Sequence, residues 1–167
     1  MMKYVILLIC TVAGFAADGT QPNVAAEFGK RWTATRKMAV GVAEAMPESE
    51  YAFKPDPPSM SFGEQMAHIA WANYAFCAAL KDEKRPALPD RSDRDGLIKL
   101  VADSMDYCSA QIATVTDAQM NSIHSTPDGK LNGRELLLAL YVHLAHHRGQ
   151  AEIYLRDKGI KPPPYVF

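Results

Sequence analysis

The chain has 167 residues, of which 48% are hydrophobic and 22% are charged, and its formal net charge is −1. This length and composition are typical of one folded globular domain. The near-neutral charge, together with basic residues that are spread out rather than clustered, excludes the electrostatic footprint of a nucleic-acid-binding protein.

The first residues have the pattern of a secretory signal peptide. A short positive start ends at Lys3, a mostly apolar and uncharged run follows, and Gly14 and Ala16 occupy the −3 and −1 positions of a cleavage site. The run is shorter than the roughly 20 apolar residues of a membrane-spanning helix. We therefore predict a cleaved segment at 1–16, a linker at 17–27, and a periplasmic or secreted protein with no stable membrane span. The alternatives are a retained membrane anchor and a cytoplasmic protein.

A first helix is predicted after the linker. Apolar residues recur there at alternating steps of four and three, which places them on one face of a helix; they are Phe28, Trp32, Thr35, Ala39, Val42 and Met46. Pro47 marks the end of this helix. Residues 47–60 contain four prolines, so we predict a connection without regular structure.

The second helix has a clear start. Ser61 and Glu64 form the S-x-x-E pattern of a capping box in front of an apolar run. We predict that this helix extends from about Phe62 to Leu80. The charged and proline-containing residues 81–89 are predicted to form a connection.

A third helix is predicted to open at Ser92, with Asp95 three residues later. Its apolar face would contain Leu97, Val101, Ser104 or Met105, Cys108, Ile112 and Val115. Cys108 of this helix and Cys77 of the second both lie in apolar helical stretches, where a free cysteine behaves as a small hydrophobic residue. Two isolated cysteines do not make a disulfide framework, so we predict that they are buried and unpaired.

The last helix follows a polar segment. Pro127-Asp128-Gly129 is a turn sequence, and Asn132 with Glu135 resembles another capping box. We predict a helix from Leu136 to Lys158 that ends with Gly159 as its C′ residue, because three prolines beyond it prevent continuation. No alternating strand pattern is found. The sequence therefore predicts an all-α protein, a four-helix bundle.

Three histidines are candidate metal ligands. His68 lies on the apolar face of the second helix, whereas His143 and His147 are four residues apart, so about 400° of helical turn puts both on one face. Imidazole is a common transition-metal ligand and is neutral at physiological pH, and a three-histidine set leaves positions open for water or substrate. Spacing alone leaves the choice between His146 and His147 open. It also allows histidines that are satisfied by hydrogen bonds without a metal.

Other polar residues near this pattern have two interpretations each. Gln150 and Tyr154 lie one and two turns beyond His147, where they could orient a ligand or donate to developing charge; these weak catalytic candidates could equally form core hydrogen bonds. Glu64 is one turn before His68 and could support it, but capping explains Glu64 equally well.

His124 lies among polar residues and is predicted to be solvated. Cys77 should point away from the histidines.

Several stretches resemble the DinB family. The resemblance covers roughly residues 28–167, and the most specific part is the last stretch with its tail. The matching stretches are Tyr51-x-Phe53-Lys54-Pro55, Phe62-Gly63-Glu64-Gln65-Met66-Ala67-His68-Ile69-Ala70-Trp71-Ala72-Asn73, and His143-Leu144-Ala145-His146-His147-Arg148-Gly149-Gln150 followed by Tyr154-Leu155-Arg156 and Gly159-Ile160-Lys161-Pro162-Pro163.

The resemblance implies a DinB-like four-helix-bundle domain over residues 28–167. It also implies a divalent metal ion held by His68, His143 and His147, which decides against His146. The metal would be zinc, nickel, iron or manganese. Members of this superfamily include S-transferases and isomerases that use low-molecular-weight thiols, and many other members have no assigned activity.

The expected function is therefore that of a divalent-metal-binding protein, with a metal-dependent enzyme of the thiol-dependent S-transferase type as its more specific form. The partner would be a small-molecule substrate or a thiol. A homodimer is a further expectation, because homodimers are the commonest oligomers among soluble proteins. The alternatives are a non-catalytic metal-binding or stress-response protein, a hydrolase that uses metal-activated water, and histidines with a structural role only.

Overall fold

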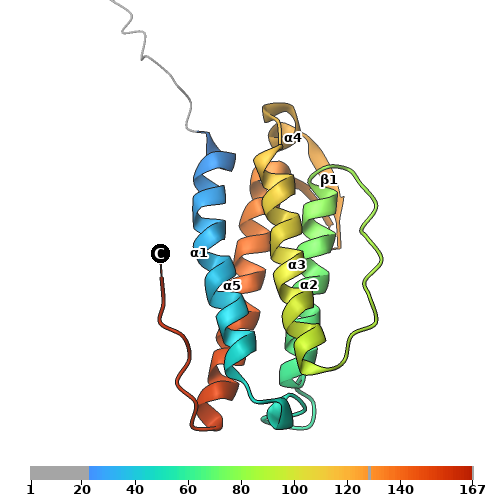
Figure 1. The fold of residues 1–167 in the computed structure, drawn as a ribbon. Helices are drawn as coiled ribbons and strands as arrows, with labels where there is room; N and C mark the ends of the chain where they lie inside the picture. The colour runs from blue at the N-terminus through green and yellow to red at the C-terminus, as the bar shows by residue number, and fades with distance from the viewer. Residues whose placement is uncertain (1–22, 128, 167) are drawn as a thin grey trace, which may run out of the picture.

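The structure is a computed structural model that describes residues 23–127 and 129–166. It contains four long helices that lie side by side (Figure 1): α1 (Val24–Ala45), α2 (Phe62–Ala79), α3 (Arg94–Ala113) and α5 (Gly133–Asp157). The all-α four-helix bundle is confirmed. The predicted signal peptide at 1–16 lies outside the described residues, whereas the end of the predicted linker was wrong, because α1 already begins at Val24.

The four long helices contact one another in the order α1, α3, α2, α5 and back to α1. In Figure 1, α1 and α5 run in one direction and α2 and α3 in the other. The parallel neighbours α2 and α3 are joined by the long connection 80–93, which passes along the side of the bundle (Figure 1). No helix in the described part of the chain is long and apolar enough to cross a membrane.

The core forms where the apolar faces of the four helices meet. The predicted face of α1 is buried from Trp32 to Val42, whereas Phe28, near the free end of the helix, is only partly buried. Trp32 is 1% exposed, and its indole N–H donates to the carbonyl of Met105 in α3 at 3.0 Å. This hydrogen bond satisfies the only polar atom of a side chain that otherwise packs as a hydrophobic group.

The ends of the helices follow the capping residues that the sequence indicates. Ser61 and Asn132 both form complete capping boxes with the glutamates three residues later. At the end of α5, Gly159 has φ of 72°, and the N–H of Ile160 donates to the carbonyl of Leu155 at 2.8 Å. This bond pattern is a Schellman motif, and the left-handed backbone explains why glycine occupies the C′ position.

The predicted start of α3 was wrong by one residue. The cap is Asp93 rather than Ser92, because the Asp93 carboxylate accepts the N–H of Gly96 at 2.8 Å. A side chain at Gly96 would meet that carboxylate, since an added Cβ would lie 2.9 Å from one of its oxygens. Glycine at this position therefore leaves room for Asp93 to cap the helix.

The polar segment before α5 is more ordered than predicted. It contains the short helix α4 (Asp117–Asn121) and an antiparallel hairpin of β1 (Ile123–Thr126) and β2 (Gly129–Asn132). Strands of four residues are too short to show an alternating pattern, so the sequence did not indicate this hairpin. The turn itself was predicted correctly, and Gly129 has φ of 121° there.

The predictions for the two cysteines and for His124 were also wrong. Cys77 and Cys108 are fully buried but paired in a disulfide that joins α2 to α3, with their Cα atoms 5.3 Å apart. Helical periodicity assigns each cysteine to a face, but it does not tell which residue of a neighbouring helix lies opposite. His124 is 0% exposed rather than solvated, because the hairpin packs its ring against Asp82 and Gln119.

Candidate metal centre

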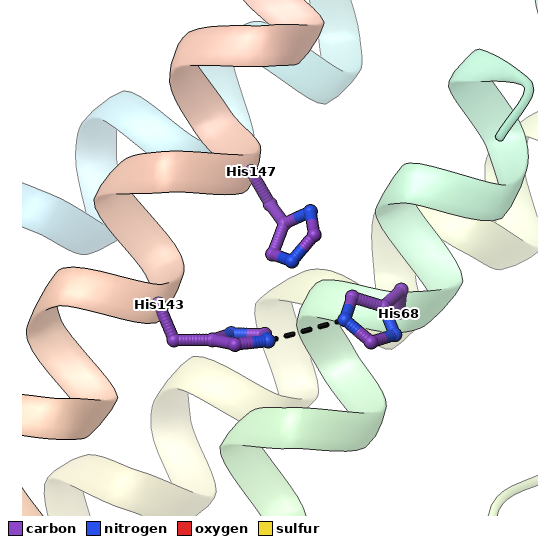
Figure 2. A group of neighbouring side chains, drawn as sticks. All are labelled: His68, His143 and His147. Carbon is purple, nitrogen blue, oxygen red and sulfur yellow. Dashed lines mark hydrogen bonds between the residues drawn. The ribbon is translucent and has the colours of Figure 1, made fainter. Parts of the chain in front are cut away.

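Three histidines from two neighbouring helices meet between α2 and α5. Figure 2 shows His143 and His147 extending from successive turns of α5 toward His68 of α2. The Nε2 atoms of His68 and His143 are 3.1 Å apart, and one nitrogen from each of the three rings lies within 4.8 Å of the others. The structure thus brings together the three histidines that the resemblance implied.

Gln65, for which the sequence predicted no role, orients the ring of His147. The ring Nδ1 of His147 is 2.8 Å from the side-chain oxygen of Gln65, and because an amide oxygen only accepts, Nδ1 carries the proton. The Nε2 atom of His147 then keeps its lone pair for the centre of the cluster. The amide nitrogen of Gln65 in turn donates to Gln150 at 3.1 Å, which holds the amide in this orientation.

The surroundings of His147 and His68 favour neutral imidazole rings. Burial, and to a lesser extent the neighbouring rings of His143, His68 and His146, lower the pKa of His147 to about 4. Burial also lowers the pKa of His68. A neutral imidazole has an unprotonated nitrogen, which is the form that binds a metal ion.

The arrangement fits a divalent transition metal. Two imidazole nitrogens on one tetrahedral zinc ion, each at about 2.0–2.1 Å from the metal, are separated by about 3.3 Å. The separation of 3.1 Å between the Nε2 atoms of His68 and His143 is close to this value. Three histidines without a carboxylate or thiolate would also leave the full double charge of the ion available for an added ligand.

The cluster lies next to a recess on the surface of the bundle. Trp71 stacks on the His68 ring, with 6.1 Å between the ring centres and 13° between the planes. Beside His68 is a recess of about 420 Å³, which is large enough for a small molecule. It is lined by Lys54, Pro58, Ser59, Met60, Glu64, Ala67 and His68.

Glu64 has a capping role in this structure. Its carboxylate accepts the backbone N–H of Ser61 at 2.6 Å and pairs with Lys54 at 2.9 Å. These contacts, the Ser61 hydrogen bond first, lower the pKa of Glu64. Of the two interpretations that the sequence left open, the structure therefore supports the cap.

The two weak catalytic candidates take part in hydrogen bonds beside the cluster. Gln150 accepts from Gln65, and the hydroxyl of the buried Tyr154 donates to the carbonyl of Met60 at 3.1 Å. Tyr154 thus has the core hydrogen bond to the backbone that the sequence analysis gave as its alternative. A catalytic role of Gln150 or Tyr154 stays a prediction.

The remaining histidine and cysteine candidates lie outside the cluster. His146 is exposed, and its ring packs edge-on against His147 with the centres 4.8 Å apart, but it is not part of the group of convergent nitrogens. Cys77 is held in the disulfide with Cys108. The packing of α5 against α2 therefore places His147, and not His146, in the group that includes His68 and His143.

The role of Gln65 had only a weak indication in the sequence. It lies three residues before His68 on the same helical face, and it is a polar residue in an otherwise apolar position that is 3% exposed. A buried amide requires partners. Those partners lie 82 and 85 residues away in the sequence, so the pattern could not identify them.

Comparisons with known proteins place the sequence in a family. Residues 31–151 match the model of the DinB superfamily. YjoA of Bacillus subtilis strain 168, described as uncharacterized, is 24% identical over 135 residues, covering 78% of this chain and 88% of YjoA.

Two solved structures share the fold. The crystal structure of the DinB-like YjoA superposes with a TM-score of 0.72 at 23% identity, covering 83% of this chain and 96% of the other. A DinB-like protein from Bacillus cereus ATCC 10987 has a TM-score of 0.71 at 17% identity, covering 84% of this chain and 95% of the other.

Proposed function

The chain belongs to the DinB superfamily, and we propose that it binds one divalent metal ion through His68, His143 and His147. The observation that carries this proposal is the convergence of three imidazole nitrogens within 4.8 Å of one another. The hydrogen bond from His147 to Gln65 supports it, because it leaves the inward nitrogen of His147 unprotonated.

Metal analysis of purified protein tests the proposal directly. We expect about one zinc, nickel, iron or manganese ion per chain, and we expect His68→Ala and His147→Ala to lose it. His146→Ala is the matched control, because His146 adjoins the cluster but is not one of the convergent ligands. A protein that takes up no metal, or that loses none in the two variants, would show that the histidines have a structural role only.

We further propose that the centre serves a metal-dependent enzyme of the thiol-dependent S-transferase type. A bound divalent ion would lower the pKa of a thiol or water in an open coordination position. His68, at the edge of the cluster, lies on the recess of about 420 Å³, and this opening supports access by a small molecule. Met60 lines this recess and Trp71 stacks on the ring of His68, so both place apolar surface beside the cluster.

Spectroscopy of the metal-loaded protein separates this proposal from the alternatives. With cobalt or nickel bound, we expect a low-molecular-weight thiol to change the ligand-field spectrum, and exogenous azide or imidazole to do so as well. A spectrum that changes with azide but with no thiol would favour the hydrolase alternative. A spectrum that responds to neither would favour a closed, non-catalytic metal site.

We also propose that the protein is exported. The sequence pattern of residues 1–16 supports this, and so does the disulfide between Cys77 and Cys108, because disulfides form and persist in oxidising compartments. Sequencing the amino terminus of the protein recovered from its host should give a start at Ala17. A start at Met1 or Met2 in a cytoplasmic fraction would contradict the proposal.

A further inference from the structure

The surface of α5 that faces away from the bundle is apolar. Leu138, Val142 and Ile153 are 63%, 57% and 52% exposed, and all three lie on this side of the helix. Ala145 and Gly149 lie between them on the same side, because steps of three and four residues return to one helical face. We call these five residues the outer face of α5. It extends over about 22 Å, at 1.5 Å of rise per residue.

The other helices of the bundle do not share this feature. Within the described residues, α1 and α3 have no exposed large hydrophobic side chain, and their outward positions carry charged pairs such as Lys99 with Asp103. Solvent-facing positions of a helix are normally polar. A row of exposed aliphatic residues on one helix only is therefore characteristic of a protein-contact surface.

Gly149 is not explained by the packing of a single chain. It is in the interior of α5, where glycine weakens a helix relative to alanine, and a Cβ added to it would meet nothing within 4 Å. No positive φ requires glycine at this position either. A glycine in the middle of an exposed apolar helix face does, however, allow a second helix to approach closely.

We propose that the outer face of α5 binds the same face of a second copy of this chain, with the two helices antiparallel. The two-fold axis would pass between positions 145 and 146. Val142 would then fill the space over Gly149 of the partner subunit, and Leu138 would lie opposite Ile153 of the partner subunit. Such a contact is isologous, because each residue pair occurs twice.

The charges at the two ends of the face fit this arrangement. Glu135 and Arg156 are both exposed, and the same two-fold axis places Glu135 opposite Arg156 of the partner subunit, and Arg156 opposite Glu135 of the partner subunit. A parallel arrangement would instead bring identical charges together at each end. The apolar centre, the glycine and the charges at the two ends together select a second copy in the antiparallel register.

The dimer would leave the metal centre accessible. His143 and His147 lie roughly 120° and roughly 160° around α5 from the centre of the outer face, on the side that packs against α2. The inference does not depend on the proposed metal-binding function, since neither the outer face nor its charges include a metal ligand.

Light scattering after size-exclusion chromatography, over a range of protein concentrations, tests the proposal. We expect a dimer that Val142→Glu converts to a monomer, raising the dissociation constant by on the order of a hundredfold. Ile123→Glu is the matched control, because Ile123 is similarly exposed, at 63% against 57% for Val142, but lies on β1. This variant should remain dimeric. A monomer at every concentration, or a dimer that Val142→Glu does not weaken, would overturn the proposal.

Two further variants test the register. Arg156→Glu should weaken the dimer because it places like charges opposite Glu135 of the partner subunit. The double variant with Glu135→Gln should recover part of the affinity, because glutamine removes the repulsion and can still accept the N–H of Asn132 in the capping box. Gly149→Ala should raise the thermal stability of the monomer, because alanine favours helix, while weakening the dimer by filling the space for Val142. If Arg156→Glu has no effect on dimerisation, or Gly149→Ala strengthens the dimer, the antiparallel register is wrong.

Discussion

Gln65 holds one ring of the histidine cluster, that of His147, in its orientation. Its side-chain oxygen fixes the proton of His147 on Nδ1, and its amide nitrogen is itself fixed by Gln150. Residues of this kind, which hydrogen-bond a ligand rather than the metal, set both the direction and the basicity of the ligand. The buried position of Gln65 in α2 also keeps water from replacing it.

We predict that Gln65→Leu lowers the metal affinity by about 10–100-fold, because His147 would lose the partner that orients it. Titration calorimetry against zinc or nickel would measure this change. Gln65→Glu is the control, since a carboxylate keeps the acceptor, and it should retain most of the affinity. Equal affinities of the leucine variant and the wild type would show that His147 needs no such support.

His124 provides a second test at the level of single residues. The ring is fully buried, with Nε2 2.7 Å from the Gln119 carbonyl and Nδ1 2.9 Å from the Asp82 carboxylate. Burial by itself would lower the pKa of His124, but these two acceptors raise it above its ordinary value. The charged ring is therefore favoured in the folded protein.

Because the folded-state pKa of His124 is raised, its contribution to stability is fully present below its unfolded pKa of about 6.5 and is lost as the pH rises through the folded-state value. Asp82→Asn removes the charge but tolerates the left-handed backbone of residue 82, where φ is 55°. We predict that the variant is less stable than the wild type at pH 6 and that the difference shrinks toward pH 9. Urea unfolding at several pH values would measure it, and a difference that grows with pH would contradict this.

At the level of elements, α2 and α3 are joined covalently. The disulfide between Cys77 and Cys108 connects two parallel neighbours that are otherwise separated in sequence by the long connection 80–93. A cross-link over 31 residues removes conformational entropy from the unfolded chain. The packing of α2 on α3 therefore does not have to supply all of the free energy that closes this connection.

We predict that the double variant Cys77→Ala/Cys108→Ala loses about 3–4 kcal/mol of unfolding free energy. The loss should appear as a lower midpoint in urea. The wild type treated with a reducing agent under unfolding conditions should lose a similar amount, which controls for the change of side chain. If the wild type and the variant unfold at the same midpoint, the disulfide does not form in the protein.

The elements themselves were predictable from the sequence because their ends are set by neighbouring residues. Ser61 with Glu64 starts α2, Asn132 with Glu135 starts α5, and Gly159 follows the end of α5, and each acts within a few residues. The predicted start of α5 at Leu136 was three residues late, because the cap at Asn132 lets the helix begin at Gly133. Contacts between distant residues were not predictable in the same way. The Cys77–Cys108 bond, the His124–Asp82 pair and the Gln65–His147 hydrogen bond join residues 31, 42 and 82 positions apart.

In the candidate site, too, local spacing was readable from the sequence, whereas the contact between two helices was not. Spacing identified His68, His143 and His147 as candidates, but one helix alone could not exclude His146. The choice depends on the rotation of α5 against α2, which is set by buried residues of both helices such as Met66 and Leu144. The family resemblance favoured His147 over His146 before the structure was considered, because a family pattern carries information on helix packing that spacing within one helix lacks.

At the level of the whole molecule, metal binding and folding should be linked. The three histidines come from α2 and α5, which meet only in the folded chain, so an ion bound there stabilises the folded state over the unfolded state. We predict that metal at 100 times its dissociation constant raises the unfolding free energy by about 2.7 kcal/mol. Thermal melts with and without metal would show this, with His147→Ala as the control that should not respond.

The order of the helices around the bundle has a consequence for how the molecule comes apart. The disulfide ties α2 to α3 and the histidine cluster faces α2 from α5, whereas α1 is held by packing, hydrogen bonds and ion pairs alone. A partial opening that releases α1 would break neither the covalent link nor the cluster. In native-state hydrogen exchange we therefore expect α1 to exchange first and the other three long helices to persist together as the slowest unit.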